Sequence, residues 1–252
     1  MIQIRKPTTV PTRLSGAGVL ATAADQADYD AHTRAYITNK KRFTINPDIY
    51  GHSSVKNALK KAQHHKCCYC EKDQHDEYGA VEHYRPKAGY KSARKTPLNK
   101  PGYYWLGYNW SNLYFVCGPC NTHKGNLFPL VDESLRATSH HQNISQEDAY
   151  ILDPNGVRDP RVHIKFDYEF VRGVDDYGRE TITACRLDRN NLNEKRKKLL
   201  NDIDYHVVVL VDQQHHPIAS VRKSRQFLQK CRRAEAEFSA AAIDYLSRFN
   251  IQ

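Results

Sequence analysis

The chain has 252 residues and a mass of 29.1 kDa, with 38 Lys and Arg against 28 Asp and Glu, which gives a formal net charge of +10. A hydrophobic fraction of 40% excludes a wholly disordered chain. The longest apolar run, Val207–Val211, is far shorter than the roughly 20 residues of a membrane span, and the N-terminus lacks the apolar segment of a signal peptide. We therefore expect a soluble, cytoplasmic protein.

The positive charge is concentrated in the middle of the sequence. Residues 51–130 hold 12 Lys and Arg and 5 Asp and Glu, a surplus of seven out of the total of ten. Such a local basic surplus is typical of proteins that bind a phosphate backbone, although it is also compatible with a merely basic surface.

Residues 1–65 are predicted to form an N-terminal arm followed by helices. A Pro- and Thr-rich arm precedes a predicted helix over 22–40. A second helix is predicted from Ser53, with a serine as its N-cap, because Val55, Leu59 and Ala62 recur on one face.

Seven cysteines occur in the chain, and their odd number argues against a disulfide framework. Four of them form two Cys-x-x-Cys pairs, Cys67 with Cys70 and Cys117 with Cys120. Two such turns supply the four thiolates of a tetrahedral Zn²⁺ site. The alternative is a set of buried free thiols or a redox pair. Cys68 breaks the pair spacing and is interpreted as a neighbour of the site, and Cys185 and Cys231 are expected to be buried apolar side chains.

The 46 residues between the two pairs exceed the usual zinc-finger spacing of about 15–20, so a substantial insertion lies inside the zinc loop. The insertion begins with the segment from Val81 to Lys87, which contains Glu82-His83, and it ends with Asn112 shortly before the second cysteine pair. Asn121 follows that pair directly. A carboxylate and an amide oxygen are ligands suited to Mg²⁺, and a histidine beside them can act on a water molecule.

Residues 131–252 are predicted to be mostly helical. Residues 134–149 are expected to form a polar loop to which no function is assigned. Helical periodicity covers 190–211 and returns over 217–249, where one long amphipathic C-terminal helix is expected. This helix would either close the core or dock a partner protein. The aromatic cluster from Tyr103 to Trp110 is expected to pack around the zinc site.

These motifs resemble the HNH (ββα-metal) endonuclease core of the Cys₄-zinc subtype. The flanking segments Cys67-Cys68-Tyr69-Cys70-Glu71, Glu82-His83-Tyr84-Arg85-Pro86-Lys87, Ile151-Leu152-Asp153-Pro154 and Leu187-Asp188-Arg189-Asn190 are similar to the retron- and Septu-associated, PtuB-like antiphage family. The resemblance runs from about residue 2 to about residue 200. It implies an α+β fold in which a zinc-stabilised ββα-metal core at 66–130 is embedded in helical elaborations over 1–65 and 131–252.

The resemblance also implies roles for individual residues. His83 matches the general base, Glu82 and Asn121 match ligands of a catalytic Mg²⁺ or Mn²⁺, and Asn112 matches the residue that braces the loop carrying the histidine. Many HNH proteins have Asp where this chain has Glu82. Flanking phosphates would be held by Arg85, Lys87 and Lys124, and His123 is a weaker candidate for a metal or phosphate contact than Asn121.

The activity implied is hydrolysis of DNA phosphodiester bonds by the nuclease effector of an antiphage system. The implied partner is a PtuA-like SMC/ABC-type ATPase, through which retron RNA or DNA could also be bound. Two alternatives stand beside this reading: a zinc-stabilised DNA-binding module without catalysis, and a stand-alone restriction-type HNH nuclease. The combination of Glu82, His83 and Asn121 favours the nuclease, since a pure binding module has no need of all three.

Overall fold

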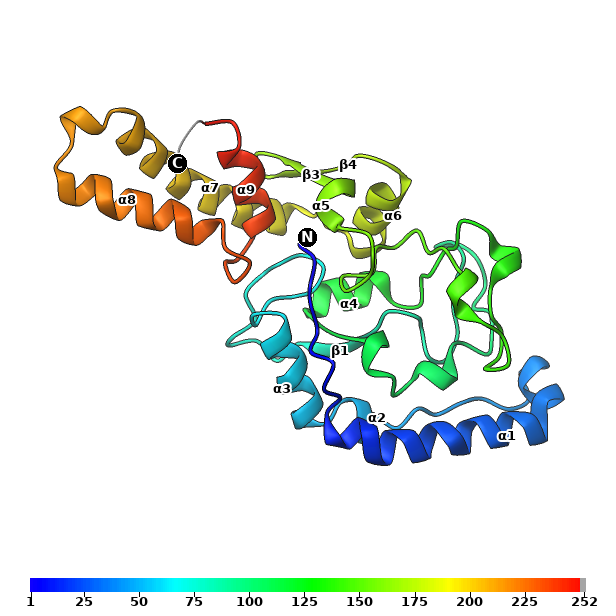
Figure 1. The fold of residues 1–252 in the computed structure, drawn as a ribbon. Coiled ribbons are helices and arrows are strands. Elements are labelled where there is room, and N and C mark those ends of the chain that lie inside the picture. The colour runs from blue at the N-terminus through cyan, green and yellow to red at the C-terminus, as the bar shows by residue number, and fades with distance from the viewer. Residues whose placement is uncertain (250–252) are drawn as a thin grey trace.

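The computed structural model describes residues 1–249, and its N-terminal region is helical (Figure 1). A π-helical turn, η1 (Leu14–Gly18), leads directly into α1 (Val19–Ile37), which is followed by α2 (Pro47–Tyr50) and α3 (Ser53–Ala62). The predicted helix over 22–40 therefore exists but begins and ends earlier. The helix predicted from Ser53 is confirmed, although its cap differs: the side chain of His52 accepts the hydrogen bond from the Ser54 N–H.

A short antiparallel hairpin occupies the centre of the molecule. Strand β1 (Ala80–His83) pairs with β2 (Leu113–Val116), with Glu82 opposite Tyr114 and His83 opposite Leu113. Helix α4 (Gly118–Lys124) follows β2 and contacts β1, so the order of elements is strand, strand, helix. The long connection between the strands contains two 3₁₀ turns, η2 (Tyr104–Leu106) and η3 (Trp110–Asn112).

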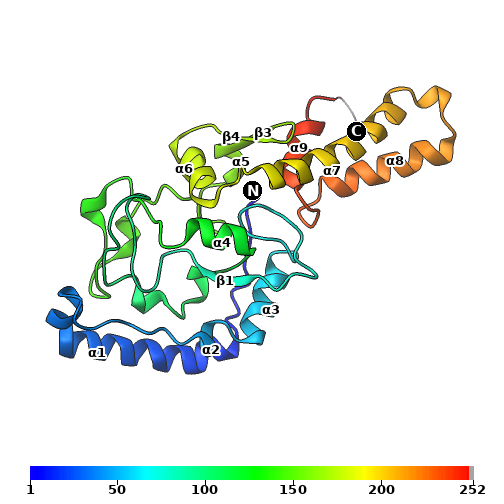
Figure 2. The same cartoon turned by 180° about the vertical axis from the view of Figure 1, so that it is seen from behind.

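The C-terminal region adds a second hairpin and most of the remaining helix. Its elements are η4 (Glu133–Leu135), η5 (Ile144–Gln146), α5 (Pro160–His163), β3 (Ile164–Asp167), β4 (Phe170–Gly173), α6 (Asp176–Cys185), α7 (Asn190–Val211), η6 (Gln213–His215), α8 (Ile218–Cys231) and α9 (Ser239–Leu246). Helices α7 and α8 form an antiparallel pair that projects from the rest of the molecule, while α1 lies along the opposite side (Figures 1 and 2).

Strand β2 separates the two main hydrophobic clusters. Side chains alternate between the faces of a strand, and all four β2 residues are buried. Tyr114 and Val116 belong to the cluster around the cysteines, which reaches Ile4 at one end of the chain and Phe238 at the other. Leu113 and Phe115 belong to a second cluster with α1 and α3. Residues from all three predicted regions share the first cluster, and the region boundaries themselves stay a prediction.

A third cluster joins α7, α8 and α9. The helix expected over 217–249 is wrong as a single element, because α8 ends at Cys231 and Phe238 has a left-handed backbone with φ of 51°. The turn lets Phe238 reach the cysteine cluster while α9 packs on β3. Helix α7 matches the predicted 190–211 helix, and the mixed α+β class is also confirmed.

The aromatic segment from Tyr103 to Trp110 packs as expected, but only partly around the cysteines. Tyr103 belongs to the cysteine cluster, whereas Tyr104, Tyr108 and Trp110 pack in the cluster beneath α1. Cys185 and Cys231 are buried, as predicted. Over the described residues 1–249, no helix combines the length and apolar character that crossing a bilayer requires.

Candidate functional site

Four cysteine sulfurs meet beside the central hairpin. The first pair, Cys67 and Cys70, lies on a tight turn in which the Glu71 N–H donates to the Cys67 carbonyl at 3.0 Å. Cys117 caps α4 and Cys120 lies in its first turn. Between them stands Gly118-Pro119, and proline suits the first turn of a helix, where its missing N–H has no partner to lose. The sequence thus places two Cys-x-x-Cys turns on two different elements.

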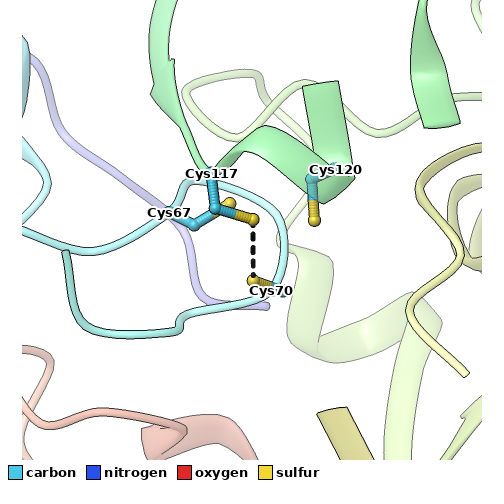
Figure 3. Close-up of side chains that lie close together, drawn as sticks. All are labelled: Cys67, Cys70, Cys117 and Cys120. Carbon is cyan, nitrogen blue, oxygen red and sulfur yellow. Dashed lines mark hydrogen bonds between the residues drawn. The ribbon is translucent and has the colours of Figure 1, made fainter. Parts of the chain in front are cut away.

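The geometry of this Cys₄ cluster fits a structural zinc ion. The four sulfurs lie within 4.8 Å of one another and face one another in Figure 3. The Sγ atoms of Cys70 and Cys117 are 3.7 Å apart, close to the roughly 3.8 Å edge of a tetrahedron with Zn–S bonds of about 2.3 Å. All seven cysteines are free and buried. Cys68 stays outside the cluster, in agreement with its interpretation as a neighbour.

Arg189 provides positive charge beside the thiolates. Its Nη1 lies 3.5 Å from Cys120 Sγ and its Nη2 lies 3.9 Å from Cys117 Sγ. Four thiolates around Zn²⁺ carry a net charge of −2, so a partly buried guanidinium lowers the cost of placing that charge in the protein interior. The sequence predicts no role for Arg189, although its segment, Leu187-Asp188-Arg189-Asn190, is one of those that carry the family resemblance.

His83 lies at the end of β1 and is only 4% exposed. Its Nε2 is 2.9 Å from the carbonyl oxygen of Gly107, so Nε2 carries the hydrogen and donates it. Its Nδ1 is then the acceptor, and it lies 3.3 Å from the Nζ of Lys87. Burial, reinforced by the positive charge of Lys87, holds the pKa of His83 well below its usual value. The imidazole is therefore neutral at pH 7, with a basic nitrogen available at Nδ1.

Asn112 holds the loop that follows His83. Its Oδ1 accepts a hydrogen bond from the Arg85 N–H at 2.7 Å, and its Nδ2 donates to the Arg85 carbonyl at 3.0 Å and to the Leu106 carbonyl at 3.2 Å. The buried amide of Asn112 thus links the loop after β1 to Leu106, the residue before Gly107. Asn112 thus lies beside the loop that follows His83, and its bracing role in a reaction stays a prediction.

Glu82 is buried and paired with Lys124. The Lys124 Nζ lies 2.6 Å from Glu82 Oε1 and 3.1 Å from the His83 carbonyl oxygen. Burial raises the pKa of Glu82, and the charge of Lys124 opposes that rise. The expectation that Lys124 holds a phosphate does not match this position, because its side chain is fully buried and bonded within the protein. The pattern missed the pairing because the two residues are 42 positions apart.

The other expected phosphate and metal contacts lie around these side chains. Arg85 is partly exposed, and its Nε binds the buried carboxylate of Glu147 at 2.9 Å. Lys87 is partly exposed beside His83. Asn121 is a partly exposed residue of α4, one helical turn before Lys124 and hence on the same face. His123 lines a separate cavity of about 250 Å³ that is also lined by Lys91 and Arg94.

The molecule is thus a mixed α+β protein in which a buried Cys₄ cluster lies beside a β-hairpin, and the first strand of this hairpin carries the consecutive residues Glu82 and His83. No family model matches the chain, and no solved structure matches it. The chain is similar to the Septu protein PtuB of Bacillus mycoides (strain KBAB4), with 35% identity over 191 residues, or 73% of this chain and 63% of the relative. The match spans less than two thirds of that relative's length.

A second relative is the Septu protein PtuA of the same strain. It is 24% identical over 148 residues, which make up 58% of this chain and 21% of PtuA. The chain therefore spans less than a quarter of the length of this second relative.

Proposed function

We propose that the chain is a PtuB-like component of a Septu antiphage system and acts as a metal-dependent HNH endonuclease on DNA. The observation that carries the proposal is the state of His83. A neutral imidazole with its Nε2–H fixed on the Gly107 carbonyl presents a single basic nitrogen, and the hairpin that holds it is anchored on the Cys₄ cluster. The similarity to PtuB supplies the biological setting.

In the proposed reaction, His83 Nδ1 takes a proton from the attacking water. Burial keeps the ring unprotonated at neutral pH, and entry of water beside it would bring its pKa back toward the operating pH, where a general base is most effective. Lys87, at 3.3 Å from Nδ1, must move aside when water enters, and its ammonium is then free to bind a phosphate oxygen. Asn112 keeps the peptide after His83 fixed, so that the imidazole does not reorient during the reaction.

Glu82 and Asn121 are the proposed ligands of the divalent cation. Their hard oxygen atoms fit Mg²⁺ or Mn²⁺. When bound, the ion stabilises the negative charge that develops on a non-bridging phosphate oxygen and on the leaving 3′ oxygen. Lys124 holds one Glu82 oxygen in the present structure, so binding the cation at that atom requires the ammonium to withdraw. Zinc in the Cys₄ cluster is proposed as structural, since four protein thiolates leave it no open position.

One observation favours a second candidate function, a zinc-stabilised DNA-binding module without catalysis. The carboxylate proposed as metal ligand already has a buried cationic partner, Lys124, at 2.6 Å. A pair of this kind also satisfies a purely structural role, because a buried carboxylate needs a compensating charge. The two candidates differ in one respect: only the nuclease depends on the imidazole of His83.

The experiment is a cleavage assay on plasmid and linear DNA with Mg²⁺, Mn²⁺ or EDTA. We expect His83→Ala to lower the cleavage rate by at least about 10²-fold, because a general base contributes typically 10²–10⁴. His64→Ala is the control, since that histidine is exposed and lies just before the first cysteine pair. Retained cleavage by His83→Ala would overturn its role as base. DNA binding without cleavage in any condition would favour the binding module.

The assay is run with and without the PtuA-like protein of the same system, and with RNA as well as DNA. We propose this protein as the partner, an SMC/ABC-type ATPase that regulates the nuclease. Cleavage that requires the partner and ATP supports the proposal. Full cleavage by the isolated chain, unchanged when the partner is added, would favour a stand-alone nuclease instead.

A further inference from the structure

Three side chains converge where α1 passes the polar loop over 134–149. Asp30 belongs to α1, and His140 and His141 belong to the loop. His141 Nε2 lies 2.8 Å from Asp30 Oδ1, and His140 Nε2 lies 3.5 Å from Asp30 Oδ2. We propose that Asp30, His140 and His141 form a second metal site, which binds a divalent transition-metal ion of the zinc type.

The donor set has the chemistry of such a site. Two imidazole nitrogens and one carboxylate are common zinc ligands, and three protein ligands leave a fourth position for water. One donor atom from each residue lies within 4.8 Å of the other two. With Zn–N and Zn–O bonds of about 2.0–2.1 Å, tetrahedral donors are about 3.3 Å apart. The two histidine nitrogens lie 2.8 Å from Oδ1 and 3.5 Å from Oδ2 of the same carboxylate, so a small rotation of Asp30 suffices to bring one oxygen and both nitrogens around one ion.

Tyr104 prepares His140 for ligation. A metal-bound histidine generally donates its other ring N–H to a fixed acceptor. The Nδ1 of His140 lies 2.5 Å from the hydroxyl oxygen of Tyr104, a residue with no exposed surface. With Nδ1–H donated to that oxygen, Nε2 is directed at Asp30.

Other His–Asp contacts in the chain lack this organisation. In each of these pairs a single histidine contacts the carboxylate; the pairs are His32–Asp28, His75–Asp73, His163–Asp175 and His215–Asp212. The proposed site instead places a histidine on each oxygen of one carboxylate and joins segments about 110 residues apart. A metal there would join α1 to the polar loop. Tyr104, which contacts His140, begins the η2 turn, and this turn leads to Gly107, whose carbonyl accepts the hydrogen bond from His83.

The test uses full-length, tag-free protein in which the Cys₄ cluster already holds one equivalent of zinc. Further Zn²⁺ is titrated by calorimetry. We expect one additional equivalent to bind the wild-type protein, and at least tenfold weaker binding by Asp30→Asn and by His141→Ala. Both residues are exposed, so the variants should melt at the wild-type temperature before the second equivalent is added. His75→Ala, which removes an exposed histidine outside the site, should bind like wild type.

A second readout identifies the ligands directly. Nitrogen chemical shifts of the imidazoles should change at Nε2 of His140 and His141 when the second equivalent of Zn²⁺ binds. The inference is overturned if wild type binds no second equivalent, if Asp30→Asn and His141→Ala bind it as tightly as wild type, or if the shifts that change belong to other histidines. None of these outcomes depends on nuclease activity.

Discussion

At the scale of single residues, the two sides of the Glu82-His83 pair have opposite environments. His83 is held by a neutral carbonyl and remains uncharged, while Glu82 is held by the buried ammonium of Lys124. Neighbours on a strand point to opposite faces, so this dipeptide places a neutral imidazole on one face and a buried ion pair on the other. The chemistry of each residue follows from the partner that the fold brings to it.

Asn112→Ala tests the clamp on the loop after β1. The variant loses three hydrogen bonds and leaves the Arg85 N–H and carbonyl without their partner. We expect the free energy of unfolding to fall by about 2–3 kcal/mol in urea denaturation, since a typical net hydrogen bond contributes about 0.5–1.5 kcal/mol. Asn126→Ala, at an exposed position, should change it by less than about 0.5 kcal/mol. Similar values for both variants would contradict the clamp.

Lys124→Met tests the buried ion pair through its pH dependence. Lys124 opposes the rise in the pKa of Glu82 that burial causes, so removing it raises that pKa further. A carboxyl group whose pKa is higher in the folded than in the unfolded state destabilises the fold when ionised, and this penalty disappears as falling pH protonates it. We expect a loss of about 3–5 kcal/mol at pH 8 and a smaller loss at pH 5.

The control for this variant is Lys72→Met, which breaks the more exposed pair with Glu77. Its unfolding free energy should change by less than about 1 kcal/mol. An equal loss for Lys124→Met at pH 5 and pH 8 would show that the Glu82 carboxylate is not the group left unpaired.

At the scale of elements, α9 is attached to the cysteine turn and not to α8 alone. The carboxylate of Glu71, directly after Cys70, accepts hydrogen bonds from the Ser239 hydroxyl at 2.8 Å and from the Ala240 N–H at 3.3 Å. The left-handed residue Phe238 turns the chain into this contact and is 2% exposed. The C-terminal helices are therefore coupled to the Cys₄ cluster through the start of α9.

Phe238→Ala should loosen this attachment. Truncating a buried phenylalanine costs about 3–5 kcal/mol through lost contacts and the cavity that remains. We expect a corresponding drop in the unfolding midpoint, together with faster amide hydrogen exchange in α9. Ile218→Ala, at a position 88% exposed, is the matched control and should leave both measurements unchanged. Unaltered exchange in α9 of the Phe238 variant would refute the coupling.

At the scale of the whole molecule, the Cys₄ cluster joins parts of the chain that are distant in sequence. Its surroundings include the N-terminal Ile4, β2, α4 and Phe238 before α9. A metal at this position closes a large loop and contributes its binding energy to folding. The cluster is thus the structural centre that keeps the Glu82-His83 hairpin in place.

Cys117→Ser is expected to remove tightly held zinc and to abolish cooperative thermal unfolding. Loss of one thiolate leaves three ligands for the ion, and structural zinc sites depend on all four. Zinc content after dialysis against a chelator and the melting curve provide the measurements. Cys231→Ala is the control, because Cys231 is buried in the separate cluster of α7, α8 and α9. A Cys117→Ser protein with wild-type zinc content would contradict the assignment.

The sequence by itself determined the local features of this protein. The paired cysteines, the helix from Ser53 and the helix over 190–211 all follow from short-range spacing, where residue type and periodicity decide the structure. The start of α1, the capping of α3 by His52 and the break at Phe238 were missed, because competing caps and tertiary packing shift the ends of elements by a few residues or more.

Only the tertiary structure decided which distant groups become partners. Four such contacts join residues between 24 and 111 positions apart. They are Glu82 with Lys124, His83 with the Gly107 carbonyl, Arg189 with the thiolates, and Asp30 with His140 and His141. No local pattern encodes such contacts. Burial then forces each polar group in the interior to take the partner that the fold supplies, because an unpaired buried charge or hydrogen-bonding group is costly.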